Sequence, residues 1–257
     1  MAAASVDGAN SVTASAGKAG LLTRTSGATI LVNEKGHEFT QFIEKGLMGS
    51  VIYYQILSTY MSDDRVGDAV NNTDPVEGNN YTAMEHHWDE AFGYLGVPVD
   101  FASNWPSERN DEAIFWGNYI RGRDALMGSS TILMDAFKTG RAAIVENDYT
   151  IKNDERQVIY RVLEKVCAAT AIHYINSALA AGGSDGEFMH VLSEAYMFIR
   201  ALQFSPNQTL NDLEILGLLQ DISDNNFNFW NATVSGLNSA KDLLSSTFAL
   251  DSIKDDL

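Results

Sequence analysis

Two of the five histidines are adjacent, in the segment EHHWDE at residues 85–90. In a helix, residues three or four positions apart lie side by side, so His87 is placed beside Glu90 and His86 pairs with Glu90. Asp89 pairs with Glu85 on the opposite flank of the same helical turn. An imidazole beside a carboxylate suits Fe, Mn or Zn better than Ca or Mg. The segment therefore predicts part of a transition-metal site, with His86, His87, Asp89 and Glu90 as candidate ligands.

Two ligands are not enough for a metal site, and a second helix offers another pair. His190 and Glu194 are also four residues apart, on a helix expected to begin near Glu187. If that helix runs antiparallel to the helix at 82–95, the two pairs can complete a set of two imidazoles and two carboxylates, as in helical-bundle metal sites. The alternative is that both pairs are ordinary salt bridges or hydrogen bonds that only stabilise their helices.

The other chemically interesting residues favour structural roles. His173 is expected to be a hydrogen-bonded core or rim residue, and His37 a helix-start residue. Cys167 lies in an apolar run and is expected to be a buried, inert thiol. Arg121 and Arg123 predict a paired helix face, with anion binding as the alternative. The chain has no glycine-rich phosphate loop, no nucleophile elbow and no His-Glu-x-x-His motif.

The elements that must position these residues are predominantly helical. Apolar residues recur at three- and four-residue steps over 38–61, 82–95, 107–144, 156–181 and 187–204, and shorter helices are expected between 209 and 250. Thr82 and Glu85 have the spacing of a capping box, and Ser184 or Asp185 is a candidate cap for the helix at 187. The run ATILV at 28–32 predicts one edge of a short hairpin. We therefore predict an all-α, bundle-like fold with a flexible lead-in at 1–27 and one helical domain at 28–257, which can be subdivided near 146–155.

Composition narrows the class of protein further. Seventeen Lys and Arg residues against 34 Asp and Glu residues give a net charge of −17. Such a surface repels phosphate backbones and anionic lipids, so nucleic-acid binding and peripheral membrane attachment are not expected. No run approaches the roughly 18 apolar residues of a transmembrane helix, and the first eight residues show no signal peptide. The single cysteine excludes an intramolecular disulfide and a cysteine-based zinc cluster.

Three segments carry a resemblance to a known family. The stretch MEHHWDEAFGYLG at 84–96, with EKGLMGS at 44–50 and HVLSEAYMFIRALQF at 190–204, resembles the imelysin-like family of bacterial envelope proteins. The resemblance runs from about residue 15 to residue 250. The Gly-x-His-x-x-Glu motif of that family is matched by His87 and Glu90, whereas Glu85 stands at the glycine position.

The resemblance implies a fold, a location and a function. Imelysin-like proteins are all-helical, with two halves that resemble four-helix bundles, and they are commonly periplasmic proteins or outer-membrane-anchored lipoproteins linked to iron acquisition. We therefore expect a non-enzymatic envelope protein that binds iron, zinc or a metal-bearing partner. The first alternative is a metallopeptidase with Glu90, Asp89 or Glu194 as general base, and the second is a structural or interaction protein without metal. The oligomeric state stays open.

Overall fold

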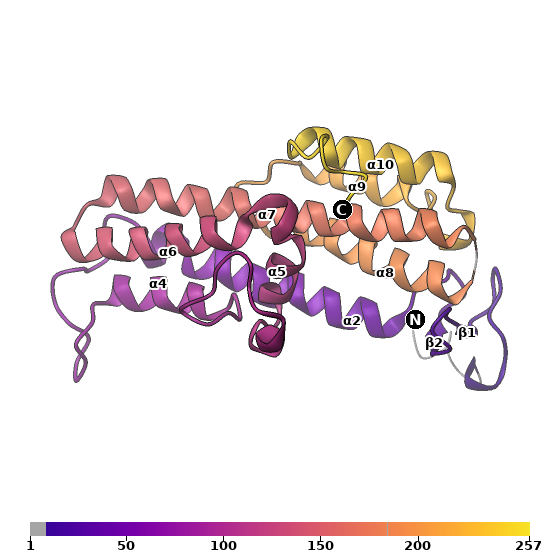
Figure 1. Ribbon diagram of the computed structural model, residues 1–257, viewed down its shortest axis with the longest axis horizontal. Helices are drawn as coiled ribbons and strands as arrows, with labels where there is room; N and C mark the ends of the chain where they lie inside the picture. The colour runs from indigo at the N-terminus through magenta and orange to yellow at the C-terminus, as the bar shows by residue number, and fades with distance from the viewer. Residues whose placement is uncertain (1–8, 184) are drawn as a thin grey trace. The chain divides into compact units, whose positions relative to one another are not determined.

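The computed structural model describes residues 9–183 and 185–257, and it divides the chain into two compact units. Unit 1 comprises Met1–Gly49, Cys167–Gln203 and Thr209–Leu257, and unit 2 comprises Ser50–Val166 and Phe204–Gln208. The long helix α7, Tyr149–Ala181, belongs to unit 2 up to Val166 and to unit 1 from Cys167 onward (Figure 1). The subdivision expected near 146–155 thus falls inside unit 2, and the expected polar link there is mostly the first turns of α7.

Unit 1 combines a two-stranded hairpin with a set of helices. Strands β1 (Gly20–Thr23) and β2 (Thr29–Val32) are antiparallel, with Gly20 opposite Val32. The short 3₁₀ turn η1 (Ala9–Ser11) precedes them. Helix α2 (Phe39–Leu47) packs against α8 (Gly186–Ala201), α8 packs against α9 (Asp212–Asp221), and α9 against α10 (Val234–Thr247) (Figure 1). The 3₁₀ turns η5 (Leu202–Phe204) and η6 (Phe229–Asn231) connect these helices.

Unit 2 contains the segment with the adjacent histidines. Most of η2 (Met48–Tyr53), all of η3 (Gln55–Tyr60), the short α3 (Asp63–Val66) and α4 (Ala83–Gly93) lie in it. They are followed by the 3₁₀ turn η4 (Ser107–Glu112) and by α5 (Trp116–Met127) and α6 (Ser129–Glu146). Helix α4 packs against η3 and α3 on one side and against α6 on another. The fully buried side chains of Trp88, Trp116, Tyr53 and Leu57 lie in this unit.

The fold confirms the predicted fold class and corrects several boundaries. The chain is predominantly helical and has one short hairpin near its N-terminus, as expected. The helix expected at 107 is only a 3₁₀ turn, and the regular helix α5 begins at Trp116. Asp185 caps α8 through a hydrogen bond from the backbone N of Phe188 (2.9 Å), whereas Ser184 and residues 1–8 of the expected lead-in lie outside the described residues. In the described ranges, no helix is long and apolar enough to cross a membrane.

The segment 38–61 departs most from its predicted pattern. After α2 the chain continues as the π-helical segments η2 and η3, so the spacing of side chains changes along it. Ile43 and Leu47, which belong to the apolar repeat over 38–61, are 63% and 54% exposed. Gln41 and Lys45 are buried instead, and Lys45 has a carboxylate partner on α8, Glu194. The apolar periodicity therefore predicted the helix but not which of its faces is buried.

Candidate functional site on helix α4

Helix α4 is anchored at both ends by local sequence features. At its start, Thr82 Oγ1 accepts from the backbone N of Glu85 (3.3 Å), and Glu85 Oε2 accepts from the backbone N of Thr82 (2.8 Å). This is the capping box that the spacing predicted. After its end, Gly96 has φ 72° and a close backbone contact with Ile114, which a side chain at position 96 would prevent. Met84, Trp88 and Ala91 form the buried stripe of the helix.

One flank of α4 brings two imidazoles and a carboxylate together. His86 Nε2 lies 3.4 Å from Glu90 Oε1, and both side chains are partly exposed. The His86 and His87 ring centroids are 5.8 Å apart. A ring nitrogen lies about 2.0–2.1 Å from a bound zinc ion, so two imidazoles that share an ion have centroids roughly 4.5–6.5 Å apart. The spacing of the two ring centroids falls in this range, while His86 Nε2 is directed at Glu90 and His87 Nε2 at Arg65.

His87 is the more sheltered of the two histidines. Burial, and secondarily the nearby Arg65, lowers the pKa of His87 below its ordinary value, which favours the neutral imidazole. Its Nε2 lies 3.5 Å from an Arg65 guanidinium nitrogen, and its buried Nδ1 has no hydrogen-bond partner among the described residues. A buried ring nitrogen without a partner is costly. The guanidinium has only N–H donors, so Nε2 is the acceptor in this contact and Nδ1 of the neutral ring carries the proton.

Aromatic rings and a cavity border the same flank. Tyr60 and Tyr94 stack with centroids 5.5 Å apart, and Tyr60 contacts the His87 ring at 6.1 Å. Burial, together with the charge of Glu90, raises the pKa of Tyr60. A cavity of about 340 Å³ lies beside them, lined by Ile52, Glu90, Gly93, Tyr94 and Phe115.

The cavity wall includes a strained residue. Phe115 has φ 49°, which is unusual for a bulky side chain, and its side chain is about half exposed. The conformation is held by backbone hydrogen bonds on both sides of Phe115, from Ile114 N to Gly96 O (2.8 Å) and from Gly117 N to Leu95 O (2.7 Å). Such strain is concentrated at functional sites, and here the strained residue lines a cavity that Glu90 also lines.

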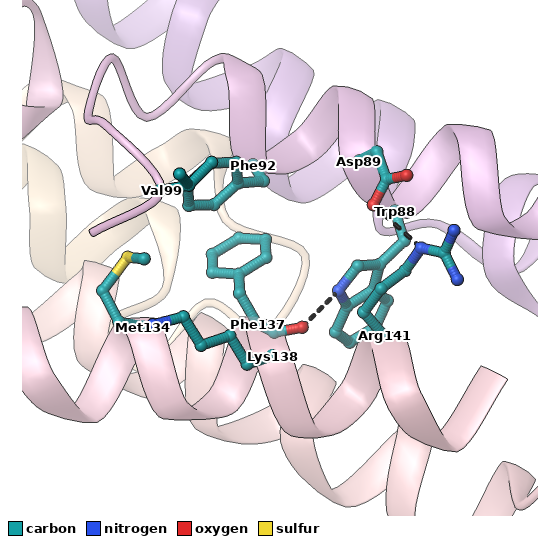
Figure 2. A pocket seen from close by; sticks show the side chains of 8 residues that line it. All are labelled: Trp88, Asp89, Phe92, Val99, Met134, Phe137, Lys138 and Arg141. Carbon is teal, nitrogen blue, oxygen red and sulfur yellow. Dashed lines mark hydrogen bonds and ion pairs between the residues drawn. The ribbon is translucent and has the colours of Figure 1, made fainter. Parts of the chain in front are cut away.

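The opposite flank of α4 is fixed on α6 by an apolar cluster (Figure 2). Trp88 Nε1 donates to the backbone O of Phe137 (2.9 Å), and the Phe137 ring meets Trp88 and Phe92 edge to face at 5.9 and 5.5 Å. A small cavity of about 150 Å³ lies beside these rings. At its rim, Arg141 donates to Asp89 (3.0 Å) and to Glu85 (2.7 Å). Asp89 is thus paired with an arginine on this flank, away from the His86–Glu90 pair.

The second predicted pair lies in unit 1, inside a buried ionic cluster. His190 Nδ1 lies 2.6 Å from Glu38 Oε2, and His190 Nε2 lies 3.5 Å from Glu194 Oε2. Glu194 Oε1 lies 3.4 Å from Lys45 Nζ. Burial raises the pKa of Glu194, although Lys45 and His190 oppose the shift. The two carboxylates flank opposite edges of the imidazole, so they do not converge on one point.

The predicted ligands therefore form two separate groups. His86, His87 and Glu90 lie together in unit 2, whereas His190 and Glu194 lie in unit 1. The expected four-ligand set is not assembled: within residues 9–183 and 185–257, no three His, Cys, Asp or Glu side chains converge so as to hold a metal ion. An ion bound on α4 would thus keep coordination positions for other ligands, as exchangeable or catalytic sites do.

Structural roles were predicted for three other residues. His37 lies two residues before α2, with Nε2 2.6 Å from the backbone O of Phe227, which confirms a helix-start role. His173 is half-buried and its ring contacts Tyr174 at 5.2 Å. Cys167 is buried, as predicted, with Sγ 3.1 Å from the backbone O of Phe198.

Sequence reasoning missed the partners of His190. Glu38 and Lys45 come from α2 and its N-cap, about 150 residues before His190, and no local spacing connects them. The one available signal was the polar residues at positions 38, 41 and 45, which recur at helical spacing on one side of α2. Together with a polar stripe on another helix, such a pattern can indicate a buried polar contact.

Comparison with known proteins places the chain in a family whose function is not known. The described residues form two helical units, with an imidazole–carboxylate group on α4 in unit 2 and a buried ionic cluster between α2 and α8 in unit 1. Residues 2–251 match the family model described as domain of unknown function (DUF4856), so the chain belongs to that family. No curated protein and no solved structure matches the chain. The resemblance to imelysin-like proteins stays a prediction.

Proposed function

We propose that this protein is a non-enzymatic binding protein, in which α4 binds a transition metal ion, or a molecule that carries one, through His86, His87 and Glu90. The observation that supports the proposal most is the grouping of two imidazoles and a carboxylate on one flank of α4. Mixed nitrogen and oxygen ligands suit iron or zinc. Iron is favoured by the family resemblance, which also leads us to propose a location in the bacterial envelope.

The surroundings of the site favour an exchangeable ion over a permanently enclosed one. Two or three protein ligands leave coordination positions open, and these can be filled by water or by the molecule that delivers the metal. Glu90 also lines the cavity of about 340 Å³ beside Tyr94 and Phe115, which offers room for the organic part of such a molecule. The net charge of −17 attracts cations from solution.

The test is calorimetric titration of the untagged chain with Zn²⁺, and with Fe²⁺ in the absence of oxygen. We expect saturable binding that weakens about tenfold or more in His86→Ala, in His87→Ala and in Glu90→Gln, since each removes one ligand. Glu77→Gln is the matched control, because it neutralises an exposed carboxylate elsewhere in unit 2. Equal binding by all four variants, or no binding by the unmodified chain, would refute the proposal.

The metallopeptidase alternative has less support. A peptidase needs three protein ligands with an open coordination position beside a substrate groove, and among the described residues no three His, Cys, Asp or Glu side chains converge in that way. Incubation with an unfolded polypeptide, with and without a chelator, separates the two functions. Chelator-sensitive cleavage that Glu90→Gln abolishes would replace the proposal of a non-enzymatic role.

A further inference from the structure

A second cavity in unit 2 has a different chemistry from the α4 site. It has a volume of about 410 Å³ and lies between the end of α5, the start of α6 and the loop before η4. Its size falls within the range of about 300–1,000 Å³ that is usual for small-molecule sites. Its wall is mainly polar: it includes Ser103, Asn104, Trp105, Arg121, Asp124 and Ser130.

Two polar groups in this wall have no partner that the fold supplies. Ser130 is 1% exposed, and its Oγ has no hydrogen-bond partner in the part of the chain that is described. Nε of Arg121 is also buried without a hydrogen-bond partner among the described residues. Nη2 of the same side chain donates to Asn118 Oδ1 (2.6 Å). Buried polar atoms are nearly always hydrogen-bonded, so each exception calls for an explanation. Here both belong to residues that line one cavity.

The start of α6 adds further groups to the same place. Gly128, with φ 60°, precedes the helix and provides no side-chain cap. Asp124 takes over part of that role, since its Oδ1 accepts from the backbone N of Ser130 (2.6 Å). Among the described residues, none donates a hydrogen bond to the other oxygen of the Asp124 carboxylate. The cavity therefore contains donors and acceptors close together.

The charges in the wall decide against a simple anion site. The positive charge of Arg121 is matched by the negative charge of Asp124, which already lies at the N-terminus of α6, where an anion would otherwise be stabilised. The chain as a whole carries −17. An anion would be repelled by the Asp124 carboxylate and by the net charge of the chain. A neutral ligand with hydroxyl groups can instead accept a hydrogen bond from Arg121 and donate one to Asp124 at the same time.

Trp105 supplies an apolar wall that is held in place. Its Nε1 donates to the backbone O of Arg109 (2.8 Å), and the Arg109 guanidinium lies over its ring at 4.1 Å. Arg109 is itself fixed by Asp100 and Glu112. One face of the indole is covered by Arg109, and an indole beside planar polar side chains suits a ring whose edges carry hydroxyl groups and whose faces carry C–H groups.

We propose that this cavity binds a neutral polyhydroxylated ring, namely a monosaccharide or a terminal sugar residue. The ligand packs on Trp105, accepts a hydrogen bond from Arg121, and exchanges hydrogen bonds with Asp124 and Ser130. The proposal is independent of metal binding, because none of these residues belongs to the α4 site.

The experiment is ligand-observed saturation-transfer NMR on the full chain with a panel of free hexoses, N-acetylhexosamines and pentoses. We expect at least one sugar to show saturation transfer that the variant Ala125→Phe abolishes, since exposed Ala125 lines the cavity and a phenyl ring there fills it. Ser130→Ala should weaken binding about three- to tenfold while leaving the fold intact, because it removes only an unpaired hydroxyl.

The matched control is Ala180→Phe, which puts the same ring on an exposed alanine of helix α7. It should bind the sugar as the unmodified chain does. The proposal is overturned if no sugar in the panel shows transfer, or if Ala125→Phe binds as well as the control. It is also overturned if inorganic phosphate, rather than any sugar, is the ligand that Ala125→Phe excludes.

Discussion

The contact between α4 and α6 depends on a glycine, which allows a sharp test of how the site is held. Gly140 lies on α6 directly against Trp88: a Cβ at position 140 would lie 2.1 Å from Cζ2 of the indole. Carbon atoms pack at about 3.5–4.0 Å, so in Gly140→Ala the ring must move by about 1.5 Å. Trp88 is 1% exposed and its Nε1 is bonded to the Phe137 carbonyl. The displacement therefore disrupts both packing and a buried hydrogen bond.

The expected magnitude follows from three opposing contributions. Overpacking of a core costs about 1–3 kcal/mol, and a buried indole N–H left without its acceptor costs about 1–3 kcal/mol. Alanine in place of glycine stabilises a helix by about 1 kcal/mol. These contributions sum to a net cost, so we expect Gly140→Ala to lower the free energy of unfolding of unit 2 by about 1–5 kcal/mol.

Gly122→Ala on α5 is the matched control. No atom lies within 4 Å of a Cβ at this helical position, so the same substitution should stabilise by about 0.5–1 kcal/mol. Urea unfolding followed by tryptophan fluorescence is the assay, since Trp88, Trp105 and Trp116 all lie in unit 2. The reasoning is refuted if both alanine variants shift the urea midpoint in the same direction. It is also refuted if Gly140→Ala lowers the free energy of unfolding as much in a Trp88→Leu background as in the unmodified chain.

Three further predictions concern charges. Removing the guanidinium beside His87 in Arg65→Ala should tighten metal binding about three- to tenfold, by the loss of one positive charge near a divalent ion; calorimetry that shows weaker binding would contradict this. In unit 1, Lys45→Met removes a positive charge beside the buried Glu194 and should lower the free energy of unfolding by about 3 kcal/mol. Much of that loss should be recovered in the double variant Lys45→Met with Glu194→Leu. If Lys45→Met alone is as stable as the unmodified chain, this pair has no stabilising role. The hydrogen bond from Arg24 lowers the pKa of Glu187 to about 2 from 4.5, so its contribution to stability is complete above about pH 4.5 and is lost as the pH falls toward 2; denaturant midpoints in that range should fall less steeply in Glu187→Gln, and identical slopes would count against the pair.

Local features of α4 could be predicted from the sequence because they depend on neighbouring residues. The capping box of Thr82 and Glu85, the stop at Gly96 and the His86–Glu90 pair all follow from spacing within one helix. The pairing of Asp89 with Arg141 could not be predicted, since Arg141 lies 52 residues further along the chain, on another helix.

The division of the predicted ligands between two units could not be predicted from the sequence either. His190 has the same i,i+4 spacing to Glu194 as His86 has to Glu90, yet one pair is buried and the other is partly exposed. The difference arises from what packs against each helix: α2 brings Glu38 and Lys45 to His190. The apolar periodicity along α2 favoured burial of the face that carries Ile43 and Leu47. In the structure these two side chains are exposed, and Lys45 is buried instead. Burial of a polar face is decided by tertiary partners, which spacing along one helix does not encode.

The most direct test of the proposed metal site is to observe the histidine rings themselves. The chain has only five histidines, so the ring nitrogens of ¹⁵N-labelled protein can be resolved by NMR and followed as Zn²⁺ is added. The account predicts large shifts for the nitrogens of His86 and His87, and unchanged signals for His37, His173 and His190. Shifts confined to the other three histidines, or no shift in any ring, would contradict metal binding on α4.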